Sequence, residues 1–181
     1  MVDQCGGFGP GQVLYHDELR TGTRTELGRK WSPAGHRPHS PIRIGYEFTY
    51  LYLTLCPFGR RVYAAFLPAL NGEWFSWFMA HIDQDLDRPC LLVADGAKAH
   101  RADAFEGTKL TFCRLPPYCP ELNPAERLFR ELRWGLKHRL LASVEEAQQR
   151  VKSLLEALCA DADTYLSLVC FPYIQHATSP F

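Results

Sequence analysis

The chain has 181 residues, of which 46% are hydrophobic and 13% aromatic, and its 20 basic side chains balance 20 acidic ones. This length fits one domain, and the apolar content excludes an intrinsically disordered chain. No apolar run approaches the roughly 20 residues that cross a bilayer, and no signal peptide opens the sequence. We therefore expect a soluble cytoplasmic protein without a membrane partner.

The cysteines, histidines and aspartates outside the motifs described below form no metal-binding or disulfide pattern. No two cysteines stand in a Cys-x-x-Cys pair, and their odd number argues against a disulfide framework. His36 and His39 lie in a loop without a nearby cysteine, which excludes a zinc site there. Asp83, Asp85 and Asp87 lack the glycine and the glutamate that a calcium-binding EF-hand loop requires. The cysteines are Cys5, Cys56, Cys90, Cys113, Cys119, Cys159 and Cys170.

The zero net charge conceals two basic regions, and the distribution of charge matters more for the choice of partner than the sum. Between Arg20 and Arg43, six basic residues stand against one acidic residue. Between Asn123 and Arg139, five basic residues stand against two acidic ones. Clusters of this kind bind nucleic-acid phosphates, so the sequence admits a DNA-binding function.

The first half of the chain predicts one strand, a long loop and a β-hairpin. Aromatic and β-branched side chains favour strands, whereas glycine, proline and charged residues without periodicity favour loops. The tripeptide Pro57-Phe58-Gly59 provides the turn of the hairpin. In chain order we expect a flexible lead-in over 1–11, a strand over 12–18 that ends at Asp17 and Glu18, a functional loop over 19–45, and hairpin strands over 46–56 and 61–67.

The second half predicts helices and strands in alternation, which is an α/β order. The run CLLVA over 90–94 is the best candidate for a buried central strand, because it is apolar throughout. Ser143 and Glu146 form a capping box that starts the last long helix. The expected elements are helices over 72–82, 102–105, 124–140 and 144–158, strands over 90–94 and 110–115, and a C-terminal tail over 161–181 that follows a domain over 12–160.

Three carboxylates stand where predicted strands or helices end: Asp17, Asp95 and Glu126. Strand ends gather at one edge of an open α/β sheet, and clustered carboxylates hold hard cations such as Mg²⁺. Two such ions ~4 Å apart can activate a water molecule for attack on a phosphodiester. Each residue alone has a simpler explanation, since Asp95-Gly96 could form a turn and Asp17 could end a solvated strand. Glu126 could complete a helix cap that Asn123 begins.

The helix predicted over 124–140 has one charged face and one apolar face. Its charged face comprises Glu126, Arg130, Arg133 and Lys137, which follow one another at intervals of four, three and four residues. Such intervals place side chains on the same side of a helix. A solvated surface explains this face as well as a ridge that contacts phosphates does. The opposite stripe, which we expect to be buried, comprises Ala125, Leu128, Phe129, Leu132 and Leu136.

The stretch LLVADGAKAHR, followed by LTFCRLPPYCPELNPAERLFRELRW, resembles the second and third catalytic blocks of DDE transposases of the mariner-like superfamily. The bacterial insertion-sequence branch of that family is the most similar. Its second block has an aspartate at the end of a strand and a histidine five residues later, as Asp95 and His100 stand here. Upstream, VLYHDELRTGTRTELGRKWSPAGHRP is similar to the first block of this branch. The resemblance covers residues 12–158, and LPPYCPELNPAE is its most specific part.

The resemblance implies an RNase H-like fold, a mixed sheet of about five strands flanked by helices. It makes Asp17, Asp95 and Glu126 the catalytic triad, which would hold two Mg²⁺ or Mn²⁺ ions. The implied reaction is cleavage of DNA at the transposon ends, which leaves a 3′-OH, and transfer of the cut strand to a TA target. The DNA-binding residues that we expect are Arg24, Arg29, Lys30, Arg37, His100, Arg130 and Arg133.

Double-stranded DNA, from the transposon ends and from the target, is the partner that the resemblance implies. No helix-turn-helix region precedes the first catalytic block, which leaves open a separate N-terminal DNA-binding polypeptide and a homodimer. Gly96 stands where the family usually has asparagine, Cys119 replaces serine, and the interval from Asp95 to Glu126 is a few residues shorter than usual. A catalytic group misplaced by ~1 Å can cost ~100-fold in rate. The alternative is therefore a catalytically inactive remnant that only binds DNA.

Overall fold

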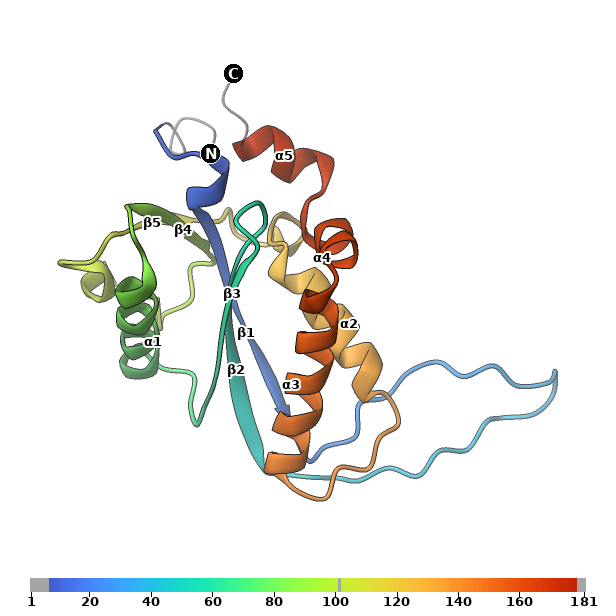
Figure 1. Cartoon of the computed structure of the whole chain (residues 1–181). Helices are drawn as coiled ribbons and strands as arrows, with labels where there is room; N and C mark the ends of the chain where they lie inside the picture. Colours follow the sequence, from blue (N-terminus) through green and yellow to red (C-terminus); the bar gives the residue numbers. More distant parts are fainter. Residues whose placement is uncertain (1–6, 101, 179–181) are drawn as a thin grey trace.

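The computed structural model describes residues 7–100 and 102–178, and a mixed sheet of five strands forms its centre (Figure 1). The strands are β1 (Val13–Gly22), β2 (Phe48–Cys56), β3 (Arg61–Leu67), β4 (Cys90–Ala94) and β5 (Leu110–Arg114). They lie side by side in the order β3-β2-β1-β4-β5. β1, β2 and β3 pair antiparallel, whereas β4 runs parallel to β1 and β5 runs parallel to β4. The predicted hairpin and the predicted central strand are both confirmed.

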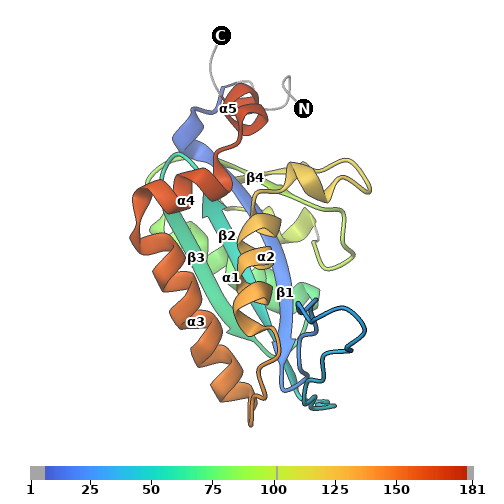
Figure 2. The same ribbon diagram turned by 90° about the vertical axis from the view of Figure 1, so that its right-hand side faces the viewer.

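Helices cover both faces of the sheet, so the fold has three layers (Figures 1 and 2). The helices are α1 (Gly72–Asp85), α2 (Ala125–Leu136), α3 (Val144–Ala160), α4 (Ala162–Val169) and α5 (Pro172–Thr178). α1 packs on one face, and α2, α3 and α4 pack on the other. A short 3-10 helix forms at Ala102–Phe105, where the sequence predicts a helix, and another forms at Pro120–Leu122. Within the described residues, no helix is long and apolar enough to cross a membrane.

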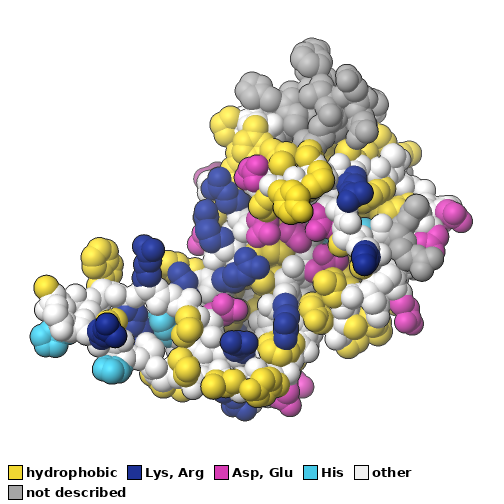
Figure 3. Space-filling model, turned by 180° about the vertical axis from the view of Figure 1, so that it is seen from behind, with side chains coloured by type: hydrophobic (Ala, Val, Ile, Leu, Met, Phe, Trp, Pro, Cys, Tyr) yellow, Lys and Arg dark blue, Asp and Glu magenta, His cyan; other side chains and the backbone are white. Residues whose placement is uncertain are grey.

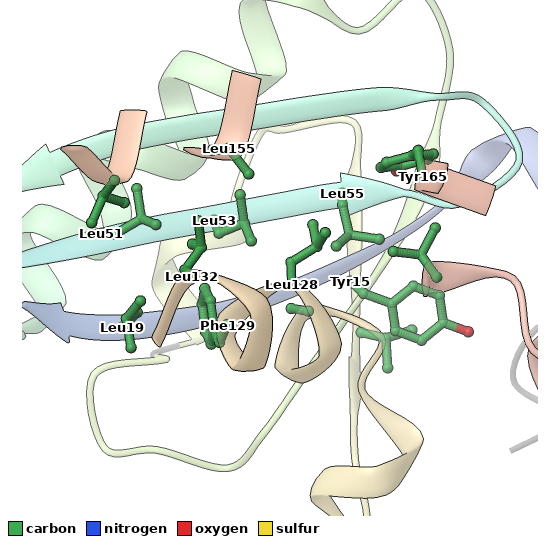
Figure 4. Close-up of a cluster of buried hydrophobic side chains, with 14 of the residues drawn as sticks. Tyr15, Leu19, Leu51, Leu53, Leu55, Leu128, Phe129, Leu132, Leu155 and Tyr165 are labelled. Atoms are coloured by element: carbon green, nitrogen blue, oxygen red, sulfur yellow. The ribbon is translucent and has the colours of Figure 1, made fainter. Parts of the chain in front are cut away.

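Side chains alternate between the two faces along β1, and this alternation builds two separate cores. Tyr15 and Leu19 point to the face of the sheet that α2, α3 and α4 cover, and they join Phe129 in the larger core (Figure 4). Leu14 belongs instead to the smaller core under α1, together with Phe75. Burial of each such side chain contributes ~1.5–3 kcal/mol, so both faces of β1 are held firmly. Around these residues, the larger core of Figure 4 includes Leu51, Leu53, Leu55, Leu128, Leu132, Leu155 and Tyr165.

β1 is longer than predicted, and Asp17 therefore lies inside a strand instead of at its end. The strand continues to Gly22, which pairs with Phe48 of β2, while Asp17 itself lies opposite Leu53. The residues after Glu18 look like a loop because they include a glycine and an arginine. Pairing with β2 satisfies their backbone groups, and this long-range contact outweighs the weak local preference.

α2 buries the apolar stripe that its sequence predicts: Ala125, Leu128, Phe129, Leu132 and Leu136 are all buried. The helix ends at Leu136, however, and not at residue 140 as predicted. The next residues leave the helical conformation, and His138 adopts a left-handed one with φ of 59°. The N–H of His138 donates to the carbonyl of Glu26 at 2.8 Å. A contact with a distant segment thus accompanies the end of this helix, and no local pattern reveals it.

The residues after position 160 fold as α4 and α5, whose apolar side chains complete the larger core. The hydroxyl of Tyr165 donates to the carbonyl of Cys56, at the end of β2, at 3.1 Å. The C-terminal segment is therefore packed against the sheet and not merely appended to it. Its buried side chains are Tyr165, Val169, Phe171 and Ile174.

Residues 23–47, called the arm below, leave the sheet between β1 and β2 and project far from the body (Figure 1). At the base of the arm, the N–H groups of Thr23 and Thr25 donate to the carbonyls of Glu47 and Arg43, each at 3.1 Å. These contacts hold the two sides of the arm together where it leaves the sheet. Further out, the arm exposes apolar side chains: Leu27, Trp31, Ile42, Ile44 and Tyr46.

Candidate active site

A cleft of about 400 Å³ brings together the three carboxylates that the sequence singles out. Asp17 comes from the middle of β1, Asp95 follows β4 directly, and Glu126 lies in the first turn of α2. The loop after β4 and the proline-rich segment 115–120 form the other walls. Figure 3 shows acidic side chains gathered in the middle of one face of the molecule, with lysines and arginines around them.

The position of Asp17 in β1 explains both its direction and its acidity. The alternation that sends Tyr15 to the face of the sheet that α2 covers sends Asp17 the same way. Burial, together with the negative charges of Glu126, Glu18 and Asp95, raises the pKa of Asp17 to about 7. The N–H of Glu18, which donates to Oδ1 of Asp17 at 2.8 Å, opposes this increase. A carboxylate under such repulsion would be strongly stabilised by a bound cation.

Asp95 lies at the end of β4, as predicted, and its side chain is 63% exposed. Its Oδ1 atom accepts a hydrogen bond from the N–H of Ala97 at 2.9 Å, which is the turn contact that the sequence also allows. The same oxygen lies 3.0 Å from Nδ1 of His100. These two contacts hold the carboxylate of Asp95 in one orientation while most of it stays accessible from the cleft.

Asn123 links the helix that carries Glu126 to the strand that carries Asp17. Its buried Nδ2 donates to the carbonyl of His16 at 2.9 Å and lies 3.4 Å from Oδ2 of Asp17. Its Oδ1 accepts a hydrogen bond from the N–H of Ala125 at 3.1 Å, so the same amide also satisfies the first turn of α2. The start of α2 is therefore held at a set position relative to β1.

The capping box that the sequence allows for Glu126 does not form, because the N–H of Asn123 donates instead to the carbonyl of Pro120 at 2.9 Å. The Oε2 atom of Glu126 lies 3.7 Å from Nη1 of Arg133, about two turns further along α2. Both side chains are partly exposed, and ion pairs in such surroundings contribute little free energy. The carboxylate of Glu126 therefore remains available for another cation.

Behind the cleft, Glu18 and two histidines form a buried hydrogen-bonded cluster. Because Glu18 directly follows Asp17, the alternation of β1 turns its side chain to the opposite face of the sheet, under α1. Its Oε1 atom accepts hydrogen bonds from Nε2 of His16 and Nε2 of His100, each at 3.1 Å. Nδ1 of His100 lies 3.0 Å from the carbonyl oxygen of Asp95. The cluster thus connects β1 to the loop after β4.

The contacts of His100 require a proton on both ring nitrogens, because each nitrogen faces an oxygen that can only accept. Burial alone would lower the pKa of His100, but the hydrogen bond and the charge of Glu18 raise it. Burial alone would raise the pKa of Glu18, yet the charges and hydrogen bonds of the two histidines lower it to about 2. Glu18 and His100 therefore form a buried ion pair.

The His16–Glu18–His100 cluster also has the spacing of a metal site, since its ligand atoms all lie within 4.8 Å of one another. A histidine must be neutral at the nitrogen that binds a metal. Both Nε2 atoms here point at the Glu18 carboxylate as donors, and His100 is held in its protonated form. This cluster consequently fits a structural hydrogen-bonded support and not a metal centre.

Asp17, Asp95 and Glu126 are arranged more openly. Among the described residues, their oxygen atoms do not all approach within 4.8 Å of one another. Mg²⁺ and Mn²⁺ prefer oxygen ligands, and Mg²⁺ keeps several positions for water and substrate phosphate. An open set of three carboxylates, one of them with its pKa raised by the others, fits such an ion.

The residues predicted to contact DNA lie in different surroundings. Arg130 pairs with Glu131 at 3.2 Å and Arg133 pairs with Glu126, but all four side chains are at least partly exposed. His100 is buried, and both of its ring nitrogens lie within hydrogen-bond distance of protein oxygens. Four of the predicted residues are exposed on the arm: Arg24, Arg29, Lys30 and Arg37.

The sequence does not reveal the residues that support the three carboxylates. Asn123 is predicted only as a helix cap, and Glu18 only as a neighbour of Asp17. The one signal that points to Glu18 is the period of two along β1, which places it on the face opposite Asp17. Arg114, which also lines the cleft, carries no signal in the sequence that would single it out.

Comparisons with known proteins identify the family and the fold of the chain. A family described as "DDE superfamily endonuclease" matches residues 12–148. No curated protein matches the sequence. Among solved structures, a pre-cleavage Mos1 transpososome is similar with a TM-score of 0.72 and 17% identity, over 99% of this chain and 60% of that chain. A Mos1 mariner paired-end complex with Mn has a TM-score of 0.72 and 17% identity, over 98% of this chain and 60% of that chain.

The isolated catalytic domain of the Mos1 mariner transposase has a TM-score of 0.64 and 16% identity, over 99% of this chain and 93% of that chain. At such low identity the likeness shows the fold, and it confirms the predicted RNase H-like architecture. The chain spans 60% of the length of the transposase chains in the two complexes. In size it therefore corresponds to the catalytic domain.

Proposed function

Because the chain belongs to the family of DDE superfamily endonucleases, we propose that it is the catalytic domain of a transposase that cleaves DNA at the ends of an insertion sequence. One observation carries this proposal: Asp17, Asp95 and Glu126 come from distant parts of the chain and line the same cleft. The proposed reaction hydrolyses a phosphodiester bond and leaves a 3′-OH, which then attacks target DNA at a TA dinucleotide. A bacterial cell, with the enzyme at the nucleoid, is the proposed setting.

Asp17, Asp95 and Glu126 are the residues that would hold Mg²⁺ or Mn²⁺, and we propose two ions. When bound, such ions activate a water molecule and stabilise the leaving oxygen of a phosphodiester. The donor set supports this assignment, because it consists of carboxylates and because the pKa of Asp17 is raised to about 7 by burial and by its acidic neighbours. Asp17 must lose its proton before it can bind a cation, so binding becomes favourable as the pH rises.

The residues around the carboxylates would keep them in place during the reaction. The side-chain amide of Asn123 orients Asp17. The imidazole of His100 orients Asp95, because its Nδ1 atom contacts both the backbone carbonyl and the carboxylate of Asp95. The Glu18–His100 ion pair connects these two supports. Precise positioning of this kind contributes several kcal/mol to catalysis, because reacting groups need not search for their geometry.

The arm is the proposed contact with DNA. Its basic residues, Arg24, Arg29, Lys30 and Arg37, are exposed and would bind backbone phosphates without reading sequence. We also propose a homodimer, because exposed apolar side chains such as Trp31 and Tyr46 on the arm lack a covering surface in one copy. A separate polypeptide with a DNA-reading domain would select the transposon ends.

A catalytically inactive remnant that only binds DNA is the second candidate. One observation favours it: the oxygen atoms of Asp17, Asp95 and Glu126 do not all lie within 4.8 Å of one another among the described residues. The same fold and the same basic arm would serve this function. The two candidates differ in whether the three carboxylates bind metal and cut DNA.

Titration of Mn²⁺ in the presence of a short DNA duplex tests the proposed function. Wild type, Asp17→Asn and Asp95→Asn are compared, with Asp163→Asn as the control, because Asp163 lies outside the cleft. We expect Mn²⁺ binding in the wild type and in the control, and its loss in both cleft variants. Cleavage of a labelled duplex with Mg²⁺ or Mn²⁺ should follow the same pattern.

Equal binding in all four proteins, or none in any of them, would contradict an assembled metal site. Mn²⁺ binding that depends on the cleft, but without any cleavage, would favour the inactive remnant. The duplex should carry a TA step, so that strand transfer into it can be scored together with cleavage.

A further inference from the structure

Gly96 follows Asp95 at the rim of the cleft. Its backbone does not require glycine, because Gly96 is not among the described glycines with positive φ. A Cβ atom on Gly96 would instead lie 2.0 Å from Nε and 2.1 Å from Nη2 of Arg114. The guanidinium of Arg114 therefore occupies the space that a side chain at position 96 would fill.

Arg114 reaches this place as the last residue of β5. Its backbone pairs with Ala94, which directly precedes Asp95, so Arg114 and Asp95 emerge from the ends of neighbouring parallel strands. Arg114 lines the same cleft as the three carboxylates. Within the part of the chain that the structure describes, its side chain makes no hydrogen bond or ion pair.

A guanidinium with free donors beside a group of carboxylates has two chemical uses. It can neutralise the carboxylates directly, but no described carboxylate lies within the 4.0 Å of an ion pair with Arg114. It can otherwise bind an anion that enters the cleft. Arginine donates two parallel hydrogen bonds to phosphate oxygens, and a phosphodiester approaching three carboxylates needs such a positive charge to offset the repulsion.

We propose that Arg114 binds a non-bridging oxygen of the DNA phosphate that enters the cleft, at the scissile bond or next to it, and that Gly96 makes room for this contact. The proposal rests on the proposed function, since it takes DNA as the substrate. It assigns to Arg114 the space beside Asp95 that Gly96 leaves open because it has no side chain.

Binding of a fluorescent duplex, measured with Ca²⁺ at several KCl concentrations, tests the contact without cleavage. The variants are Arg114→Ala and Arg114→Lys, with Arg88→Ala as a control, because Arg88 is exposed and pairs with Asp87 outside the cleft. For Arg114→Ala we expect the slope of log affinity against log salt to decrease by about 0.9, the value for one lost phosphate contact. Arg114→Lys should keep the slope, because the charge remains.

Cleavage and metal binding give independent measurements on the same proteins. Arg114→Ala should cut DNA at least about 10-fold more slowly than wild type, and Arg114→Lys should fall between them, because lysine cannot make the paired hydrogen bonds. Mn²⁺ affinity should stay within about twofold of wild type in both variants, because Arg114 makes no contact with a carboxylate.

Gly96→Ala tests the second half of the proposal. The new methyl group would push the guanidinium away, so this variant should lose the same contact as Arg114→Ala. The double variant Gly96→Ala/Arg114→Ala should then be no worse than Arg114→Ala alone, because the contact can be lost only once. Circular dichroism and the melting temperature check folding; if Gly96→Ala misfolds, the two Arg114 variants still decide the phosphate contact.

An unchanged salt slope in Arg114→Ala would overturn the proposal. So would a several-fold gain in Mn²⁺ affinity without a change in slope, because Arg114 would then act as an internal counter-ion. If Asp95→Asn still abolishes cleavage in either case, the proposed function stands and only the role of Arg114 fails. If the wild type neither binds metal nor cuts DNA, the proposed function fails, and the salt slope still decides whether Arg114 contacts DNA.

Discussion

Oε1 of Glu18 and Nε2 of His100 lie 3.1 Å apart and join two segments that are separated by 82 positions in the sequence. Both side chains are almost completely buried, with exposed fractions of 8% and 1%. His100 also contacts the carbonyl oxygen of Asp95 at 3.0 Å. The ion pair therefore holds Asp95 in place relative to the strand that carries Asp17.

Glu18→Gln should destabilise the protein by about 3–5 kcal/mol, because it leaves a buried imidazolium without its counter-ion. His100→Gln should destabilise the protein by a similar amount, because it leaves the buried carboxylate of Glu18 without the charge of His100. The double variant removes both charges, so its loss should be smaller than the sum of the single losses. Urea unfolding of the four proteins at pH 7 measures this coupling, and strictly additive losses would show that the two residues do not form a pair.

Asp17→Asn should stabilise the metal-free protein, and more so at high pH. The pKa of Asp17 is 3.8 in a model peptide and about 7 in the fold, so the folded state holds an extra proton between these values. Stability therefore falls as the pH rises through this window, by up to about 4 kcal/mol, and does not fall further above it. Asparagine does not titrate, so Asp17→Asn should raise the free energy of unfolding by up to about 4 kcal/mol at pH 8 and by almost nothing at pH 4. Urea unfolding in EDTA at both pH values checks the prediction, which equal gains would contradict.

Mn²⁺ binding should tighten as the pH rises from 6 to 8, because Asp17 must release its proton to bind a cation. The pKa of about 7 places this change within the measured range. Titration calorimetry in two buffers with different ionisation enthalpies measures the number of protons released when Mn²⁺ binds. At pH 7 we expect a fraction of one proton per bound ion, released from Asp17. Asp85→Asn, outside the cleft, should behave like wild type. A pH-independent affinity would show that Asp17 is not a ligand.

The basic residues of the arm should govern the salt dependence of DNA binding. A variant in which Arg24, Arg29, Lys30 and Arg37 are all replaced by glutamine should bind a duplex more weakly. Its slope of log affinity against log salt should decrease by about 0.9 for each lost phosphate contact. Mn²⁺ binding should not change, because these residues do not line the cleft. Fluorescence anisotropy measures the slope, and an unchanged slope would remove the arm from the DNA interface.

Tyr165→Phe should lower the free energy of unfolding by about 1 kcal/mol, because the hydroxyl donates to the carbonyl of Cys56 inside the core. Tyr165→Ala should cost about 3–5 kcal/mol, since it also leaves a cavity. Tyr118→Phe is the control, because Tyr118 is 99% exposed. Thermal or urea unfolding compares the three variants. A negligible effect of Tyr165→Ala would mean that the C-terminal helices do not contribute to the core.

Local pattern by itself determined a large part of this protein. The apolar run over 90–94 identified a central strand, and the spacing of Leu128, Phe129 and Leu132 identified the buried side of α2. These signals are reliable because they depend on neighbours within a few positions, where strand and helix periods decide which face a side chain takes. The motif around Asp95 and Glu126 identified the carboxylates that meet in the cleft.

Tertiary structure alone decided how those carboxylates are supported. Pairing with β2 extended β1 beyond Asp17, and the extended strand turned Glu18 toward His100 on the far face. Arg114 reached the space above Gly96 only because β4 and β5 lie side by side. Each of these relationships joins residues far apart in the chain, and a single sequence records which residues are present but not which distant backbones will pair.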